Sequence, residues 1–396
     1  MKKNSTILAF ITILALAVMG CKLQSSPSGE PQSPQPFNPQ PGQPDTPLPP
    51  STPVQADLFK FVKTVQVTPD DISLAGGFIR IGYIPATDHF DVAYGTPKLA
   101  HPSGGCQDGA HVYKEYTLDM QPAGSSGVLN CGGGDSAELF FDNVLYDVSV
   151  RPVNGSHGWH IEKFDAATWK KLGELDYALD EPQEGSGDMM IEYVNGVLDI
   201  SSGYTTYGGP SPMDVGASTH HKFFTPDLKF LDQKILSDTP HITGSSMIYV
   251  DGSYYFIAGT AFTGDVIMMQ YDKDWKYLGM KELRKQAHFS EGVAFDGQRF
   301  YISYLDTSQR TNPGFWPFYP NVHLAAFDRN WNLVEDVTVT NYTAANNVTT
   351  GRPWLLLHGN RVYVSYDVTQ RDVNNKNMDI LDSIQAYVAV YELTGK

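Results

Sequence analysis

The amino-acid sequence predicts an all-β fold made of six related four-stranded units. The clearest unit runs from Ser245 to Lys285 and reads as four short strands in succession. Its first two strands, SMIYV and SYYFIAGT, are separated by Asp251-Gly252. An Asp-Gly pair between apolar runs is a strong hairpin signal, because the turn needs positive φ and glycine adopts it at little cost. One such unit buries little surface alone, so its recurrence along the chain decides the fold.

The second strand of this unit recurs along the whole chain. Each copy has an aromatic, Leu or Val entry, then Val or Ile, then a small residue; the small residues are Ala93, Ser149, Ser201, Ala258, Ser303 and Ser365. The third strand and its turn recur as well, in FDAATWKKLGEL, FTPDLKFLDQKI, YDKDWKYLGMKEL and FDRNWNLVEDVTV. Six four-stranded units at this spacing are typical of a six-bladed β-propeller.

The two ends of the repeat region predict how the ring closes. The segment from Asp57 to Val67 is an isolated strand, whereas the last unit ends with YVAVYELTGK and lacks a fourth strand. If the N-terminal strand completes the last blade, the ring has no free edge through which to aggregate. This 3+1 closure resembles that of known propellers, and it predicts one domain over residues 57–396.

Residues 1–20 have the features of an export signal. Lys2 and Lys3 precede an apolar run of about 12 residues, which is too short for a membrane span of roughly 20. The sequence at Gly20-Cys21 resembles a bacterial lipobox; the alternative is an ordinary signal peptide with an incidental cysteine. The resemblance implies a lipoprotein with a diacylglyceryl group on Cys21, stably anchored in the membrane. Lys22 in place of Asp favours the outer membrane over the inner one.

Residues 21–56 predict a stalk between the lipid anchor and the propeller. The segment is rich in Pro, Gln and Ser and cannot pack a core. Such sequences favour extended polyproline II, at about 3.1 Å per residue, so the stalk could hold the domain up to roughly 100 Å from the membrane.

The charge of the chain bears on its partners. Asp and Glu number 44 against 28 Lys and Arg, which gives a net charge of −16 and makes nucleic acid an unfavourable partner. An acidic surface suits cations such as Ca²⁺, but it more commonly serves as a solvated surface. No other cofactor is predicted.

Cys106 and Cys131 are the cysteines that remain beyond Cys21. In an exported protein, such a pair predicts a disulfide. It would close a loop of about 25 residues and stabilise the fold by roughly 3 kcal/mol. The alternative is a metal site formed by the two thiols with His101 and His111.

Candidate ligand-binding residues lie just before the first strand of each unit. Known propellers bind ligands at a mouth of the central channel, so this resemblance implies a mixed polar ring there. Its members are Asp135, Asp188, His241, Glu291 and Arg352. Such a ring could hold a sugar, a carboxylate or a cation, although any solvated channel mouth carries polar residues.

Glu291 and His288 are the only candidates for catalysis. A carboxylate at the mouth, opposed by Arg352, could serve as a general base or as a ligand clamp. The sequence has no nucleophile elbow, His-Glu-x-x-His, P-loop or EF-hand motif. His220 and His221 are adjacent and point to opposite faces of a strand, so they cannot chelate one ion together. One of them could be a ligand with remote partners, but surface positions are expected for them.

An aromatic insertion, Asn312–Pro320, offers a second recognition surface. Trp316 and Tyr319 in this Pro-bounded loop could stack against a sugar or another protein, or fold back as a hydrophobic plug.

The sequence favours a cell-envelope module that binds a glycan, a peptide or a partner protein. The alternative is a carbohydrate-active enzyme, a hydrolase or lyase. Hydrolysis requires two carboxylates about 5–5.5 Å or 6.5–9.5 Å apart in an open pocket. A scaffold for an envelope complex is a third hypothesis.

Overall fold

A computed structural model shows the repeats as β-sheets. It describes residues 58–68, 79–96, 110–130, 136–154, 156–179, 189–203, 219–236, 242–260, 264–308, 320–343, 348–370 and 384–394. All regular structure in these ranges is strand, and none of them contains a helix that could cross a membrane.

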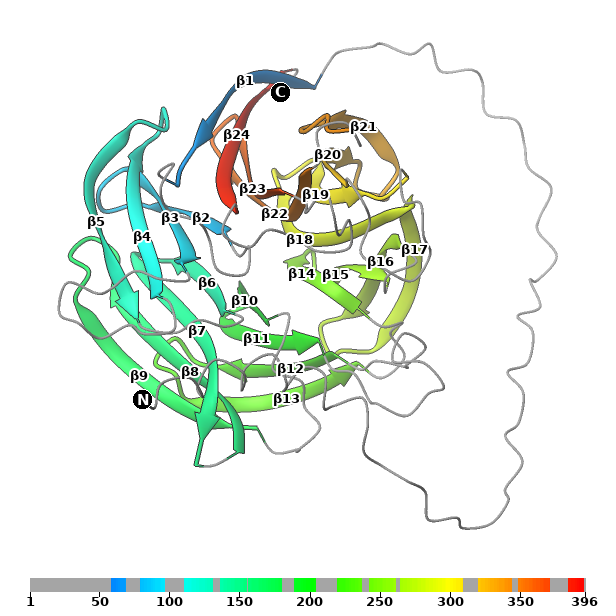
Figure 1. The fold of residues 1–396 in the computed structure, drawn as a ribbon. Helices are drawn as coiled ribbons and strands as arrows, with labels where there is room; N and C mark the ends of the chain where they lie inside the picture. Colours follow the sequence, from blue (N-terminus) through cyan, green and yellow to red (C-terminus); the bar gives the residue numbers. More distant parts are fainter. Residues whose placement is uncertain are drawn as a thin grey trace, which may run out of the picture. The chain divides into compact units, whose positions relative to one another are not determined.

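The described strands form six antiparallel four-stranded sheets, which are the blades of the propeller (Figure 1). Blades 1 to 3 contain β2(Ile79–Ile84), β3(His89–Thr96), β4(Ala110–Thr117), β5(Pro122–Asn130); β6(Ser136–Phe141), β7(Val144–Val153), β8(Ser156–Asp165), β9(Lys171–Ala178); and β10(Met189–Val194), β11(Val197–Gly203), β12(Thr219–Phe224), β13(Phe230–Leu236). Blades 4 to 6 contain β14(Ile242–Val250), β15(Ser253–Thr260), β16(Asp265–Asp272), β17(Tyr277–Lys285); β18(Ala287–Phe295), β19(Phe300–Asp306), β20(Asn321–Phe327), β21(Leu333–Thr338); and β22(Val348–His358), β23(Arg361–Gln370), β24(Gln385–Leu393), β1(Phe59–Gln66). The predicted six-bladed architecture is confirmed.

The predicted 3+1 closure is also confirmed. Strand β1 pairs antiparallel with β24, from Phe59 opposite Leu393 to Gln66 opposite Tyr387. The first strands of successive blades contact one another in the order β2, β6, β10, β14, β18, β22, and β22 contacts β2. The ring is therefore closed by hydrogen bonds between the two ends of the domain.

Local sequence explains the hairpins within the blades. Asp251 and Gly252 have φ of 52° and 82°, the left-handed values that the Asp-Gly pair predicts. Asn195 and Gly196 make the same kind of turn in blade 3, with φ of 49° and 89°. These turns join the first and second strands directly, so the innermost hairpin of each of these two blades is encoded locally.

The small residues of the second strands are buried, and their size lets neighbouring blades approach. Ser303 Oγ of blade 5 donates to the carbonyl of Pro353 in blade 6, at 3.0 Å. Ser365 Oγ of blade 6 donates to the carbonyl of Ile79 in blade 1, at 3.1 Å. Each hydroxyl thus ties one blade to the first strand of the next.

The core consists of the interfaces between blades. Hydrophobic clusters of described residues fill the interfaces of blades 2–3, 3–4, 4–5, 5–6 and 6–1. The interface of blades 1 and 2 is different, because five buried carboxyl groups lie on the facing strands of these two blades: Asp91, Glu115, Glu138, Asp147 and Glu162. Buried carboxyl groups need hydrogen bonds, cations or protons, so this interface is electrostatically the most demanding one.

Candidate ligand site in the central channel

The first strands of blades 1, 2, 5 and 6 surround a hollow of about 260 Å³ in the channel. Its walls are largely apolar; they comprise Ile81, Gly82, Glu138, Leu139, Phe140, Val293, Ala294, Phe295, Trp354, Leu355, Leu356 and Leu357. Gly82 is required here, since a Cβ atom at this position would lie 2.0 Å from the ring of Phe140. An apolar hollow with few polar groups has the character of a ligand pocket.

Arg80 lies two residues before Gly82 on β2, at the end of the channel where the first strands begin. Its side chain is only 2% exposed. Its Nη2 atom is 3.5 Å from the sulfur of Met190 on β10, and its guanidinium carbon is 4.2 Å from the ring centroid of Trp354 on β22. A guanidinium over an indole face is a favourable cation–π contact. Arg80 therefore connects blades 1, 3 and 6 around the channel.

Glu192 of β10 is a buried carboxyl group whose pKa the charge of Arg80 lowers. Burial raises the pKa of the Glu192 carboxyl well above its usual range, and the nearby Asp199 raises it further. The backbone N–H of Met247, which donates to Oε2 at 2.5 Å, and the charge of Arg80 oppose this rise. Glu192 therefore keeps its proton over a wider pH range than an exposed glutamate does. While it is protonated, it carries no negative charge to balance the charge of Arg80.

Behind Glu192, Asp199 and His221 form a buried pair between blades 3 and 4. The Nδ1 atom of His221 lies 2.8 and 3.0 Å from the two carboxylate oxygens of Asp199. The other ring nitrogen, Nε2, is buried and has no hydrogen-bond partner among the described residues. A cavity of about 10 Å³ lies beside it, lined also by Ser201 and Ser245, and this is close to the space of one water molecule.

The structure places only part of the predicted mouth. Asp135, Asp188, His241, Trp316 and Tyr319 lie outside the described residues, as do Cys21, Cys106 and Cys131. Glu291 belongs to β18, but its side chain is not among those described. These assignments stay predictions.

His288 and Arg352 lie on the neighbouring first strands β18 and β22. Arg352 is half-buried with φ of 28°, at an irregularity in the register between Gly351 and Trp354. His288 is 1% exposed and is therefore buried. The expectation of surface positions for His220 and His221 is wrong: they are 3% and 1% exposed, because both faces of β12 pack against neighbouring blades.

Sequence reasoning missed Arg80, Glu192 and Asp199. A signal was present, since each is the one charged residue of its strand: IRIGYI, MMIEYV and VLDISSG. A charge on a strand that is buried on both faces is costly, so it generally has a specific partner.

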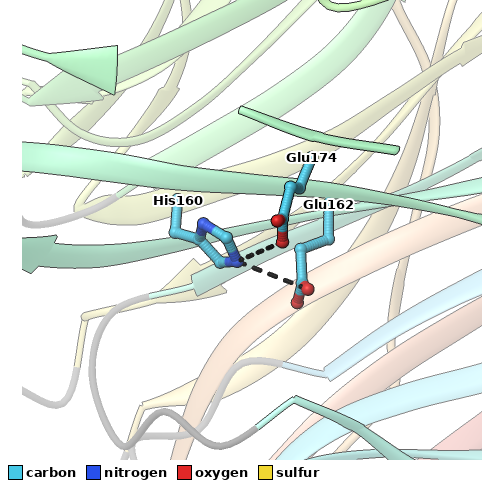
Figure 2. A group of neighbouring side chains, drawn as sticks. All are labelled: His160, Glu162 and Glu174. Atoms are coloured by element: carbon cyan, nitrogen blue, oxygen red, sulfur yellow. Dashed lines mark ion pairs between the residues drawn. The ribbon is translucent and has the colours of Figure 1, made fainter. Parts of the chain in front are cut away.

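One group of described side chains could hold a metal ion. His160, Glu162 and Glu174 of blade 2 bring three ligand atoms within 4.8 Å of one another (Figure 2). This cluster lies on β8 and β9, the outer strands of the blade.

Neither protein-family models nor curated proteins match this chain. Among solved structures, the phage phi92 endosialidase is similar, with 8% identity over 84% of this chain and 69% of that chain and a TM-score of 0.52. The subtype N11 neuraminidase-like protein of A/flat-faced bat/Peru/033/2010 (H18N11) is similar with 10% identity over 85% of this chain and 95% of that chain and a TM-score of 0.50. At such identities the likeness concerns the fold, which agrees with the six-bladed ring.

Proposed function

We propose that this chain is an exported, lipid-anchored protein whose propeller binds an acidic glycan in the central channel. The observation that carries this proposal is the channel hollow of about 260 Å³, whose wall includes Trp354, with the buried guanidinium of Arg80 4.2 Å from the centroid of that ring. Arginine binds carboxylates with two parallel hydrogen bonds, and an aromatic face suits the apolar face of a sugar ring. The name of the phage protein, endosialidase, supports a glycan that carries a carboxylate.

Binding is favoured over hydrolysis by the state of the carboxyl groups near Arg80. Glu192 and Asp199 face each other across β10 and β11, as two catalytic carboxyl groups would. The cavity beside them has room for only about one water molecule. A glycosidic bond needs an open pocket between its two carboxyl groups. The described geometry therefore supports a receptor for a sugar more than an enzyme.

The proposed location rests on the sequence. Cys21 would carry the lipid, and residues 21–56 would hold the propeller away from the outer membrane. Labelling with a radioactive fatty acid tests this: the wild-type chain should incorporate label and the Cys21→Ala variant should not. Equal labelling of the two chains would rule out the anchor.

The glycan proposal is tested with the full chain and three probes: sialyllactose, an oligogalacturonate and neutral lactose. We expect at least one acidic probe to bind and lactose to bind more weakly. Arg80→Gln should weaken acidic binding about tenfold to a hundredfold, the value of one charge-assisted contact of roughly 1.5–3 kcal/mol. Arg329→Gln is the matched control, because Arg329 is an exposed arginine that bonds Asp251 on the surface. Failure of every acidic probe, or equal affinity in a folded Arg80→Gln variant, contradicts the proposal.

A further inference from the structure

The cluster of His160, Glu162 and Glu174 is built by strand geometry. His160 and Glu162 are two residues apart on β8 and therefore point to the same face of the sheet. Glu174 of β9 lies directly opposite Glu162 in the register. The Nε2 atom of His160 is 3.3 Å from Glu162 Oε1 and 3.9 Å from Glu174 Oε2 (Figure 2). An imidazole nitrogen and two carboxylates thus converge on one point.

A fourth side chain orients the imidazole. The Nδ1 atom of His160 is 2.8 Å from Oδ1 of Asp176 on β9. A neutral ring that donates from Nδ1 to a carboxylate presents the lone pair of Nε2 on its other side, toward Glu162 and Glu174. The same carboxylate–histidine arrangement typically supports histidines that bind metals, because it fixes the tautomer and raises the basicity of the ligand nitrogen.

Glu162 supplies an independent sign of a missing ligand. Glu162 is 5% exposed, and its Oε2 atom is buried without a hydrogen-bond partner in the described part of the chain. The other oxygen, Oε1, contacts His160 and Lys171. A buried carboxylate oxygen without a partner is costly, and a cation bound by the Glu162 carboxylate would lower that cost.

Lys171 currently provides the positive charge of the cluster. Its ammonium contacts both Glu162 and Glu174. The side chain is 43% exposed and stands at the start of β9, so the ammonium can move into water when another cation takes its place. Glu174 is also exposed, which leaves the cluster open to solvent.

We propose that His160, Glu162 and Glu174 bind one divalent transition-metal ion, with Zn²⁺ or Mn²⁺ as the suitable class, in exchange for the ammonium of Lys171. A mixed nitrogen and oxygen ligand set suits these ions, whereas Ca²⁺ and Mg²⁺ favour ligand sets made only of oxygen. Three protein ligands leave a fourth position for water. The ion would link β8 to β9 and stabilise blade 2, independently of any ligand in the channel.

Blade 5 provides a natural comparison. His323 of β20 also places Nδ1 2.8 Å from an aspartate, Asp336 of β21. Ala325, however, stands opposite Asp336, at the position that Glu162 takes opposite Glu174. The guanidinium of Arg284 also contacts Asp336. Asp306 lies 3.8 Å from Nε2 of His323, but the Arg284 guanidinium already pairs with Asp336, so this histidine should bind metal more weakly than His160 does.

The test is calorimetric titration of the full-length chain, purified without a histidine tag, with Zn²⁺, Mn²⁺ or Ca²⁺ alone. We expect one Zn²⁺ or Mn²⁺ per chain and weaker Ca²⁺ binding. Lys171→Met should raise the affinity about tenfold, because it removes a competitor worth about 1.4 kcal/mol. Asp176→Asn should lower the affinity about 10–100-fold, as typical for the residue that orients a ligand.

Two substitutions that should abolish metal binding and one control substitution complete the test. Glu174→Gln should abolish metal binding, and because Glu174 is exposed, this variant should still fold. His160→Asn should also abolish metal binding. His323→Asn should bind as the wild type does. The proposal is overturned if neither the wild type nor Lys171→Met binds Zn²⁺ or Mn²⁺, or if Glu174→Gln binds as tightly as the wild type. Because the channel site uses none of these residues, the glycan probes report on a separate proposal.

Discussion

The indole Nε1–H of Trp169 donates to Glu115 Oε1 at 3.0 Å, and this hydrogen bond crosses the interface of blades 1 and 2. Trp169 lies in the turn between β8 and β9 with φ of 58°, and its ring stacks on Tyr113 of blade 1 at 3.4 Å. Trp275 and Trp331 occupy the same turn in blades 4 and 5 and also contact the preceding blade. The tryptophan of this repeated turn therefore packs its blade against the preceding one, and in blade 2 its indole N–H also donates to a buried carboxylate.

Trp169→Phe should destabilise the protein by about 1–3 kcal/mol, because a buried carboxylate loses a donor while the stacking is largely kept. Trp331→Phe is the matched control: its indole N–H is buried and has no hydrogen-bond partner among the described residues, so no hydrogen bond is lost. Urea unfolding of both variants measures the difference. Equal losses in the two variants would show that the Glu115 contact contributes nothing beyond ring packing.

Glu192→Gln should change how stability depends on pH. The folded-state pKa of Glu192 is raised, so its contribution to stability is present below the ordinary carboxyl pKa and is lost as pH rises through the folded-state pKa. The variant cannot lose a proton, so its stability relative to the wild type should increase as pH rises above about 4.

Asp119→Asn should show the opposite trend, since the hydrogen bond and charge of Arg361 lower the pKa of Asp119. Its favourable contribution is present above the ordinary pKa and is lost as pH falls through the folded-state pKa. Unfolding curves of the wild type and both variants, measured at several pH values from about 3 to about 9, test the predictions for Glu192 and Asp119. Parallel profiles for the wild type and Glu192→Gln would contradict the prediction for Glu192.

Gly82→Ala should destabilise the fold by about 1–3 kcal/mol, because the added methyl group overlaps the ring of Phe140 and forces it to move. Gly173→Ala is the control, since its new Cβ would meet only the flexible side chain of Lys163, at 3.2 Å. Adding Phe140→Leu to Gly82→Ala should recover part of the loss. A Gly82→Ala variant with wild-type stability would show that the channel wall adapts freely.

Phe59→Ala should cost about 3–5 kcal/mol, the usual range for a buried phenylalanine. Phe59 of β1 is 6% exposed and packs on Tyr301 of blade 5 and Tyr391 of β24, so it holds the closing strand against its own blade and against blade 5. Phe61 lies two residues further along the same strand and is 57% exposed, so Phe61→Ala should cost much less. Comparable thermal unfolding midpoints for both variants would argue against closure through Phe59.

The candidate channel site could be predicted only in its general place. The sequence predicted a polar ring at the end where the first strands begin, and Arg80 and Arg352 do lie on first strands at or near the channel. It did not predict Arg80 itself, because the contact to Met190 joins residues 110 positions apart in the chain. Nor did it predict the burial of His220 and His221, because the sequence of one strand does not show how neighbouring blades pack against it.

The sequence by itself determined the blades, their hairpins and the closure by β1, because alternating strands and turn residues such as Asp251-Gly252 act locally and repeat. Only the tertiary structure decided which polar side chains meet. Asp91 lies near Glu138 and Arg80 lies over Trp354 because closure of the ring brings separate blades face to face. The physical reason is that strand pattern encodes the direction of a side chain, whereas its partner across a blade interface depends on how all six blades pack.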